Sequence, residues 1–363
     1  MSLKVGIVGL PNVGKSTLFN ALTLSRGAEA ANYPFCTIEP NVGIVEVRDE
    51  RLEKLRETVH GEKVVPATVE FVDIAGLVRG AASGEGLGNK FLSHIRECDA
   101  ILEVVRVFDE SVVTHVENSL DPKRDIEIIH AELILADLDT VTRAIGQFEK
   151  KASTGDKDAK LAFGALKNVE TLLLEGKLAN IAVLEPDEEE IIQKYFLLTK
   201  KPFIYAVNVS EHMLAGGSTD LSEKLGLPPT APILPVSAKL EEELMDLTAE
   251  EKCMFLDDLG LKETGLDALI KVAFTALGLM YYFTAGEKEV RAWTIRKGYT
   301  APKAAGEIHT DFEKGFIKAD VVNWNDLVTS GGWAKARENG KVRLEGKEYI
   351  VQDGDVMVFK FNV

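Results

Sequence analysis

Gly9-Leu10-Pro11-Asn12-Val13-Gly14-Lys15-Ser16 matches the pattern G-x-x-x-x-G-K-[ST] of a phosphate-binding loop. The apolar run 3–8 precedes this loop, and a helical pattern over 17–22 follows it. In a strand–loop–helix unit of this kind, successive backbone N–H groups and the positive N-terminus of the helix face the phosphates of a nucleotide. The sequence therefore predicts a P-loop nucleotide-binding domain.

Four residues of this loop have separate chemical roles. Gly9 and Gly14 allow backbone conformations and a close approach of the phosphates that a Cβ atom would block. Lys15 brings a positive charge to the β- and γ-phosphates, which makes it a catalytic candidate. Ser16 offers a hydroxyl group to Mg²⁺, so Mg²⁺ is the expected cofactor.

Two motifs further along the chain add groups that a nucleotide-dependent switch needs. Asp73-Ile74-Ala75-Gly76 follows the strand pattern 68–72. We expect the Asp73 carboxylate in the Mg²⁺ shell and the Gly76 N–H, a second catalytic group, near the γ-phosphate. Thr37, on a loop between helix and strand, offers another hydroxyl to the metal. Segments that contact the γ-phosphate in this way are ordered by the triphosphate and released after hydrolysis.

Short apolar runs alternate with helical stretches through much of the chain. These runs lie at residues 3–8, 43–47, 68–72, 100–107, 203–207 and 233–236. Their near-continuous apolar character indicates strands that are buried on both faces of a mainly parallel sheet. Right-handed crossovers would connect such strands. The sequence therefore predicts an α/β fold.

Residues 121–199 lack strand signals for most of their length. Apolar residues recur three and four apart over 126–136, and the same spacing continues in a shifted phase over 138–148. A turn then leads into a second helical run over 157–175. We expect two antiparallel helices that form a coiled-coil arm, without one straight heptad seam.

The segment 280–363 has a different pattern. Apolar and polar residues alternate in several short runs that are separated by glycine turns, which indicates a small mixed β domain. The sequence therefore predicts three parts: a nucleotide-binding domain over 1–120 and 200–279, a helical arm over 121–199, and the C-terminal domain.

Length and composition limit the class of protein. The chain has 363 residues, of which 45% are hydrophobic, so a sizeable core is expected. No apolar run approaches the roughly 18 residues of a membrane-spanning helix, and the N-terminus lacks a secretory signal, so no membrane partner is expected. Three cysteines cannot form a disulfide framework, which favours a cytoplasmic location. The net charge of −16 argues against indiscriminate nucleic-acid binding.

The base-reading motif departs from the guanine-specific pattern N-K-x-D. The corresponding stretch is Asn208-Val209-Ser210-Glu211, with valine for lysine and glutamate for aspartate. Adenine has an acceptor at N1 and only C–H at position 2, so a carboxylate there has no donor to meet. Ser237-Ala238-Lys239 nevertheless matches the loop that closes over the base in GTPases. A GTPase therefore stays an alternative to an ATPase.

These motifs together resemble those of the YchF/Obg-like ATPase family. The resemblance rests on YPFCTIEPNVG at 33–43, the D-x-x-G motif, the glycine-rich tract 80–88, the N-x-x-E variant and HTDFEKGFIKA at 309–319. It covers essentially the whole chain and implies a C-terminal β-grasp (ubiquitin-like) TGS domain. It also implies hydrolysis of ATP in preference to GTP, and association with the ribosome, through its large subunit or the whole particle.

The resemblance also assigns the ligands of the phosphates and the metal. The phosphate ligands are six consecutive residues: Asn12, Val13, Gly14, Lys15, Ser16 and Thr17. Ser16 and Thr37 would lie at the metal. Asn12 stands where some relatives place a potassium ligand, so K⁺ is a further cofactor that the resemblance admits.

For the base and the attacking water, the resemblance points to residues outside the loop. Phe108, Asn208 and Val209 would surround the adenine, while core packing is the other interpretation of Phe108. Leu77 stands where Ras-like enzymes place a glutamine, and an aliphatic side chain cannot position water. The resemblance makes His115 the catalytic substitute, because a neutral imidazole can orient water, and a solvated loop histidine is the alternative.

A function of another class also stays open. The chain could be a ribosome- or RNA-binding module whose C-terminal domain and helical arm hold the partner. In that case the nucleotide would mainly stabilise the fold.

Overall fold

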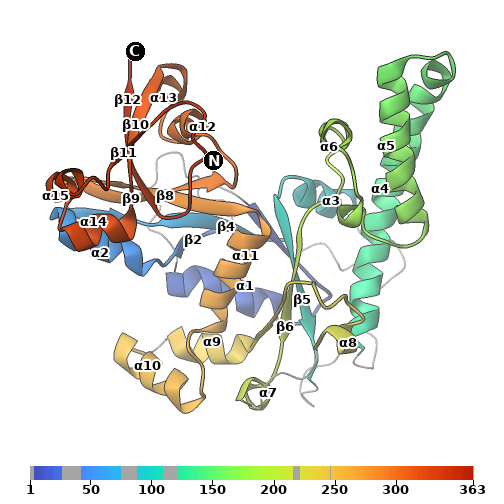
Figure 1. Ribbon diagram of the computed structural model, residues 1–363. Coiled ribbons are helices and arrows are strands. Elements are labelled where there is room, and N and C mark those ends of the chain that lie inside the picture. Colours follow the sequence, from blue (N-terminus) through green and yellow to red (C-terminus); the bar gives the residue numbers. More distant parts are fainter. Residues whose placement is uncertain are drawn as a thin grey trace.

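The described part of the chain contains two β-sheets, the helices that pack on them and a projecting pair of helices in this computed structural model (Figure 1). The described residues are 4–26, 42–74, 88–108, 121–215, 221–245 and 247–362. The helices α4 (Pro122–Ser153) and α5 (Lys157–Leu174) project on the side of the first sheet that is opposite the second sheet. The predicted α/β fold with a helical arm and a C-terminal sheet domain is confirmed.

The first sheet has the strand order β2-β4-β1-β5-β6-β7. Among its described strands, β2 pairs antiparallel with β4 and all other neighbours pair in parallel. A strand is present at each of the six predicted apolar runs, and β5 is buried along its whole length. The strands are β1 (Lys4–Val8), β2 (Val42–Val47), β4 (Ala67–Asp73), β5 (Ala100–Arg106), β6 (Phe203–Asn208) and β7 (Ile233–Val236).

Helices pack on this sheet and connect it to the second one. Helix α1 (Lys15–Arg26) packs against β1, β2 and β4, and α11 (Gly265–Ala276) packs against β5, β6 and β7. Helix α11 also contacts β8 (Leu279–Ala285) of the second sheet. The other described helices before β8, outside residues 121–199, are α2 (Glu50–Val59), α3 (Asn89–Arg96), α7 (Glu211–Ala215), α8 (Leu221–Leu225), α9 (Ala238–Met245) and α10 (Ala249–Asp258).

Each helix of the arm begins at an aspartate that caps it. Asp121 Oδ1 accepts a hydrogen bond from the Arg124 N–H at 3.1 Å, and Asp156 Oδ1 accepts one from the Ala159 N–H at 3.0 Å. Gly155, with a φ of +99°, lies in the turn between the two helices. A short 3₁₀ helix (Ala179–Ile181) and α6 (Pro186–Gln193) follow on the way back to the sheet.

The shifted phase of the apolar residues in α4 has a physical cause. Buried residues between 126 and 133 belong to the core of the first sheet, whereas those between 134 and 145 pack with α5. The helix therefore changes its packing partner partway along, and its apolar face turns with it. Just beyond this point, the Asp137 carboxylate accepts hydrogen bonds from the N–H groups of Leu198 at 2.9 Å and Thr199 at 2.7 Å, which fasten the returning chain to α4.

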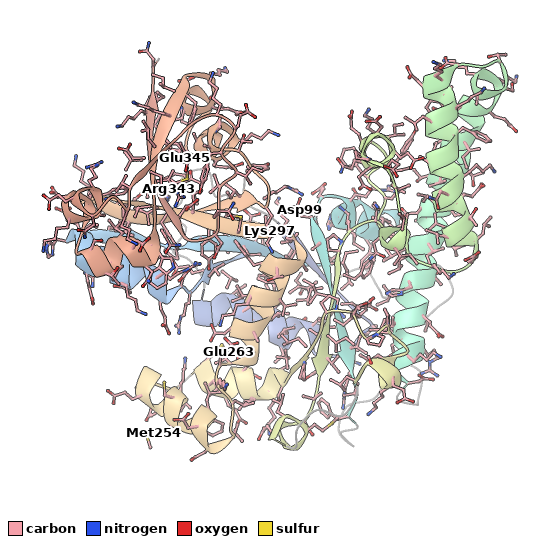
Figure 2. All side chains as sticks on the ribbon, viewed as in Figure 1. Asp99, Met254, Glu263, Lys297, Arg343 and Glu345 are labelled. Carbon is pink, nitrogen blue, oxygen red and sulfur yellow. The ribbon has the colours of Figure 1, made fainter. Side chains whose placement is uncertain are left out.

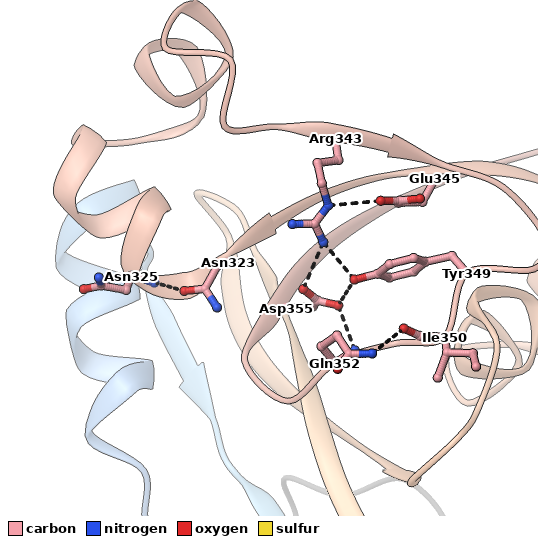
Figure 3. A network of polar contacts seen from close by, with 8 residues as sticks. All are labelled: Asn323, Asn325, Arg343, Glu345, Tyr349, Ile350, Gln352 and Asp355. Atoms are coloured by element: carbon pink, nitrogen blue, oxygen red, sulfur yellow. Dashed lines mark hydrogen bonds and ion pairs between the residues drawn. The ribbon is translucent and has the colours of Figure 1, made fainter.

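The second sheet has the order β11-β10-β12-β8-β9-β3. A polar network fastens the loop before β12 (Figure 3): Arg343 donates to Tyr349 Oη at 2.8 Å, and Tyr349 donates to Asp355 Oδ2 at 2.7 Å. Further elements are β9 (Glu289–Arg296), β10 (Phe316–Asn323), β11 (Arg343–Glu345), β12 (Asp355–Phe361), α12 (Ala301–Gly306), α13 (Thr310–Lys314), α14 (Trp324–Ser330) and α15 (Trp333–Glu338). The assignment of this domain as a β-grasp TGS domain stays a prediction.

Part of the N-terminal half is built into the second sheet. Strand β3 (Lys63–Val65) pairs in parallel with β9 at the edge of that sheet. Arg51, at the start of α2, donates to Asp353 at 2.8 Å, and its guanidinium lies 5.0 Å from the centroid of the Phe283 ring. The sequence did not predict β3, because three residues are too few to show a period. The predicted division into domains stays a prediction.

A further contact joins the two halves near the end of α3. Arg296 Nη2 lies 3.9 Å from Asp99 Oδ1, and Asp99 Oδ2 accepts a hydrogen bond from the Lys4 N–H at 2.9 Å. Figure 2 labels Asp99 and Lys297 at this place. Within the described ranges, no helix is long and apolar enough to cross a membrane.

Candidate nucleotide site

The loop between β1 and α1 adopts a backbone that only particular residues accommodate. Gly9 has a φ of +151° and Gly14 a φ of +100°. A Cβ atom on Gly9 would lie 2.5 Å from the Val104 carbonyl oxygen, and one on Gly14 would clash with the Asn208 amide. Both glycines are therefore required by packing as well as by conformation.

Lys15 is almost completely buried at the start of α1, with 6% of its surface exposed. Its Nζ donates a hydrogen bond to the Leu10 carbonyl at 2.6 Å. Burial lowers the pKa of this ammonium group to about 8, and the charge of Asp73 opposes the shift. A charged group that is poorly solvated and close to a helix N-terminus is well placed to receive an anion.

Asn208, at the end of β6, ties the phosphate loop to a second loop. Its Nδ2 donates to the Val13 carbonyl at 2.9 Å, and its Oδ1 accepts from the Ala238 N–H at 3.2 Å. The predicted role of Asn208 is to serve adenine N7. An amide nitrogen carries two hydrogens, so the second N–H is left for such a ligand while the first holds the phosphate loop.

A cavity of about 410 Å³ opens beside the loop and collects most of the predicted site residues. Residues from the loop, from the end of β5, from β6 and from α9 share its wall. They are Asn12, Gly14, Lys15, Ser16, Thr17, Arg106, Phe108, Asn208, Ala238, Lys239 and Glu242. Arg106 and Glu242 belong to no sequence motif of the site. The available signal for Arg106 was a charged residue at the end of a mostly apolar strand, two positions before Phe108.

Two predicted binding residues do not reach this cavity with their side chains. Val209 is only 2% exposed and instead lines a neighbouring, more apolar cavity of about 700 Å³. Val13 is also buried, and it takes part through its carbonyl group, which accepts the Asn208 bond.

Glu211 occupies the place of the guanine-reading aspartate and faces a cation. Its Oε1 lies 3.7 Å from Nζ of Lys239, which also lies 3.6 Å from Glu243. Lys239 belongs to the predicted base-closing loop and lines the cavity, whereas Glu211 does not line it. The carboxylate at this position is therefore engaged with the protein's own lysine.

Ser16 and Asp73 are the described candidates for the metal. Ser16 is exposed at the first turn of α1, and Asp73 ends β4 beside Ile7 of β1. A hydroxyl and a carboxylate are hard oxygen donors that suit Mg²⁺. The described residues contain no cluster of three or more His, Cys, Asp or Glu that could hold a metal ion. Thr37, Gly76, Leu77 and His115 lie outside the described residues.

A glycine-rich phosphate loop between the first strand and first helix of a mainly parallel sheet defines a P-loop nucleotide-binding protein of the GTPase class. A family model described as "50S ribosome-binding GTPase" matches residues 4–136. The model YchF-GTPase_C, described as "Protein of unknown function (DUF933)", matches residues 279–362.

Similar proteins extend over the whole chain. "Ribosome-binding ATPase YchF" of Bacillus subtilis (strain 168) is 54% identical over 367 residues and covers 100% of both chains. "Obg-like ATPase 1" of Gallus gallus is 47% identical over 369 residues, which are 99% of this chain and 93% of its own. The solved "Structure of the Schizosaccharomyces pombe YchF GTPase" is 40% identical, with a TM-score of 0.90 over 99% of this chain and 98% of its own. The chain belongs to the YchF/Obg-like ATPase family.

Proposed function

We propose that this chain is a Mg²⁺-dependent ATPase that changes conformation with its bound nucleotide and associates with the ribosome. The observation that carries the proposal is the buried Lys15 in a glycine loop, facing a cavity that also holds an aromatic ring, Phe108. Relatives that match the whole chain are named ribosome-binding ATPases, and this supports hydrolysis of ATP and association with the ribosome.

The loop would bind the triphosphate. Backbone N–H groups of residues 12–17 would surround the phosphates, as at other helix N-termini. Lys15 Nζ would leave the Leu10 carbonyl and bind the β- and γ-phosphate oxygens, whose negative charge would compensate its own. Mg²⁺, held by Ser16, Asp73 and Thr37, would neutralise negative charge on the phosphates. Asn12, which is exposed on the loop with a φ of 64°, is the candidate through which K⁺ would act.

Hydrolysis needs a water molecule in line with the γ-phosphate. The water oxygen forms the new bond to phosphorus and gives up a proton to the phosphate or to solvent, the bond to the bridging oxygen of ADP breaks, and ADP and phosphate leave. We assign to the neutral imidazole of His115 the role of orienting this water, because the aliphatic side chain of Leu77 cannot do so. The Gly76 N–H would hold the γ-phosphate. Both residues belong to segments that would report the nucleotide state.

Adenine is the base that the pocket favours. Glu211 does not line the cavity, and its carboxylate has Lys239 as a partner at 3.7 Å, which supports a base other than guanine. Phe108 lines the cavity and offers a π-face to either purine. Ser237-Ala238-Lys239 supports GTP as the alternative.

The ribosome is the proposed partner, with RNA contacts through the C-terminal domain and the helical arm. The C-terminal segment is nearly balanced in charge, unlike the acidic remainder of the chain, so it can present basic residues to RNA. A cytoplasmic location follows from this partner.

Competition of ATP and GTP for a fluorescent nucleotide, combined with turnover measurements, tests the proposal. We expect ATP to displace the probe at lower concentration than GTP. We expect His115→Ala to lower turnover about 100-fold while ATP affinity stays within two-fold. Equal turnover of the variant and the wild type would remove His115 from the mechanism, and preference for GTP would select the alternative base.

A further inference from the structure

Arg106 is a buried cation at the edge of the candidate nucleotide cavity. It is the last residue of β5, its surface is 4% exposed, and it lines the same cavity as Lys15 and Phe108. We propose that Arg106 is a positioning residue, which fixes the Phe108 ring as the platform on which the base of the nucleotide stacks. This inference rests on the proposed binding of a nucleotide in this cavity.

One guanidinium group holds Phe108 in two ways. Arg106 Nε donates a hydrogen bond to the Phe108 carbonyl at 2.9 Å. The Cζ atom of the same group lies 4.8 Å from the centroid of the Phe108 ring, within the range of a cation–π contact. The first contact fixes the backbone of Phe108 and the second fixes the orientation of its ring. A flat, fixed ring is a better stacking surface than a mobile one, because less conformational entropy is lost when the base binds.

The charge of Arg106 is unusual for a buried position. Buried arginines normally pair with a carboxylate, and the described residues record no such pair for Arg106. Glu103, on the same strand, bonds instead to His130 Nε2 at 3.1 Å. Within the part of the chain that the structure describes, the Phe108 ring and the wall of the cavity are the recorded neighbours of the guanidinium. A cation behind an aromatic ring also draws electron density from it, which strengthens stacking against a purine.

The sheet places this unit next to the phosphate loop. Arg106 lies opposite Asn208 in the parallel register of β5 and β6. Asn208 in turn bonds to Val13 of the loop. The base platform and the phosphate loop are thus held at a fixed separation by two neighbouring strands, as a single nucleotide would need.

A second interpretation makes Arg106 a counter-ion of the phosphates. Inorganic tripolyphosphate separates the two, because it has the phosphates of ATP and no base. The test is isothermal titration of the full chain with ATP and with tripolyphosphate, in the presence of Mg²⁺. The variants are Arg106→Lys, Arg106→Met, Phe108→Leu and the double variant Arg106→Met with Phe108→Leu. Lys15→Met is the control that removes a phosphate contact.

We expect Arg106→Lys and Arg106→Met each to weaken ATP about ten-fold and to leave tripolyphosphate within two-fold. Lysine keeps the charge and loses the planar group and the Nε donor, so it should not rescue ATP binding. In the Phe108→Leu background, Arg106→Met should weaken ATP by less than two-fold further. Lys15→Met should weaken both ligands.

Three results would overturn the inference. One is ATP affinity restored by Arg106→Lys, which would leave charge as the whole effect. Another is an equal loss of ATP and tripolyphosphate affinity, which would make Arg106 a phosphate ligand. The third is full additivity with Phe108→Leu. A wild-type chain that binds tripolyphosphate but not ATP would reject the proposed function as well, and so is distinguished from failure of the Arg106 assignment.

Discussion

The two ends of the nucleotide cavity are built in different ways. The phosphate end comes from consecutive residues of one loop, with Lys15 at its centre. The base end comes from residues that are separated in the sequence and belong to the end of β5, the end of β6 and the start of α9. They are Arg106, Phe108, Asn208 and Lys239. The phosphate end therefore depends on local backbone conformation, whereas the base end depends on the register of a parallel sheet. Substitutions at the two ends should separate binding of phosphates from binding of the base.

The largest effect is expected for Lys15→Met. Removal of the charge nearest the phosphates should lower the affinity for ATP and for tripolyphosphate more than 100-fold. This is roughly the effect of losing the charge-assisted hydrogen bonds of one ammonium group. The same change should stabilise the nucleotide-free chain by about 3 kcal/mol at most at pH 7, because it removes a cation whose pKa burial lowers to about 8. Calorimetric titration and thermal unfolding check the two parts. A loss of both affinity and stability would contradict the account of Lys15.

The pH dependence of binding follows from the same residue. The pKa of Lys15 is about 8 in the nucleotide-free chain, and a bound triphosphate would raise it. Below pH 8 the ammonium is already charged, so affinity should be flat. Above pH 8 binding must take up a proton, so affinity should fall by up to about ten-fold per pH unit. Titrations at pH 7, 8 and 9 in two buffers of different ionisation enthalpy measure the affinity and the proton uptake. Lys15→Arg is the control without proton uptake, and a flat wild-type profile would refute the mechanism.

The same shift affects stability with the opposite trend. The pKa of Lys15 is lowered from 10.5 to about 8 on folding, so the unfolded chain binds more protons between these values. Stability of the nucleotide-free chain should therefore rise with pH across this window through the Lys15 contribution.

Asn208→Ala should affect both ends at once. The variant loses the bonds to the Val13 carbonyl and from the Ala238 N–H, which join the phosphate loop to the base-closing loop. We expect ATP and tripolyphosphate to bind about ten-fold more weakly and the chain to lose about 1–2 kcal/mol of stability. Asn180→Ala, which removes an exposed amide in the short 3₁₀ helix after the arm, is the matched control. A loss confined to ATP would place Asn208 at the base end alone.

Glu103→Gln should have the smallest effect and should leave nucleotide binding unchanged. Glu103 shares β5 with Arg106, but its carboxyl bonds to His130 of α4, and burial raises its pKa despite that bond. Below the unfolded pKa of about 4.5 the carboxyl is protonated in both the folded and the unfolded chain, so it does not affect stability. As the pH rises towards the raised folded pKa, the unfolded chain ionises first, and the free energy of unfolding falls. Glutamine keeps the hydrogen bond without the charge. It should raise stability by about 1 kcal/mol at pH 8 and by less at pH 5.

Thermal unfolding of Glu103→Gln and Glu103→Ala over that pH range provides the check. The alanine variant should be less stable, because it loses the bond to His130 and leaves a cavity. A stability gain that grows as the pH falls would show that Glu103 is charged and favourable in the native state.

The sequence predicted more of the phosphate end of the cavity than of the base end. The loop 9–16 is contiguous, so its pattern alone predicted the glycine turn, the place of the lysine and the helix start, whereas the burial of Lys15 appeared only in the structure. Arg106 and the Asn208 bridge could not be predicted, because they depend on which residues of β5 and β6 come to lie side by side. The shifted phase in α4 was visible in the sequence, while its cause, a change of packing partner, needed the fold. Strand β3 was missed because its three residues are too few to show a period, and its pairing with β9, more than two hundred residues away, needed the fold.

A crystal structure of the chain with Mg²⁺ and a non-hydrolysable ATP analogue tests the central claim most directly. The account predicts the triphosphate among the N–H groups of residues 12–17, with Lys15 at the β- and γ-oxygens. It predicts the adenine stacked on Phe108, with Arg106 on the other face of that ring. A nucleotide bound elsewhere, or an adenine directed away from Phe108 while the phosphates occupy the loop, would contradict it.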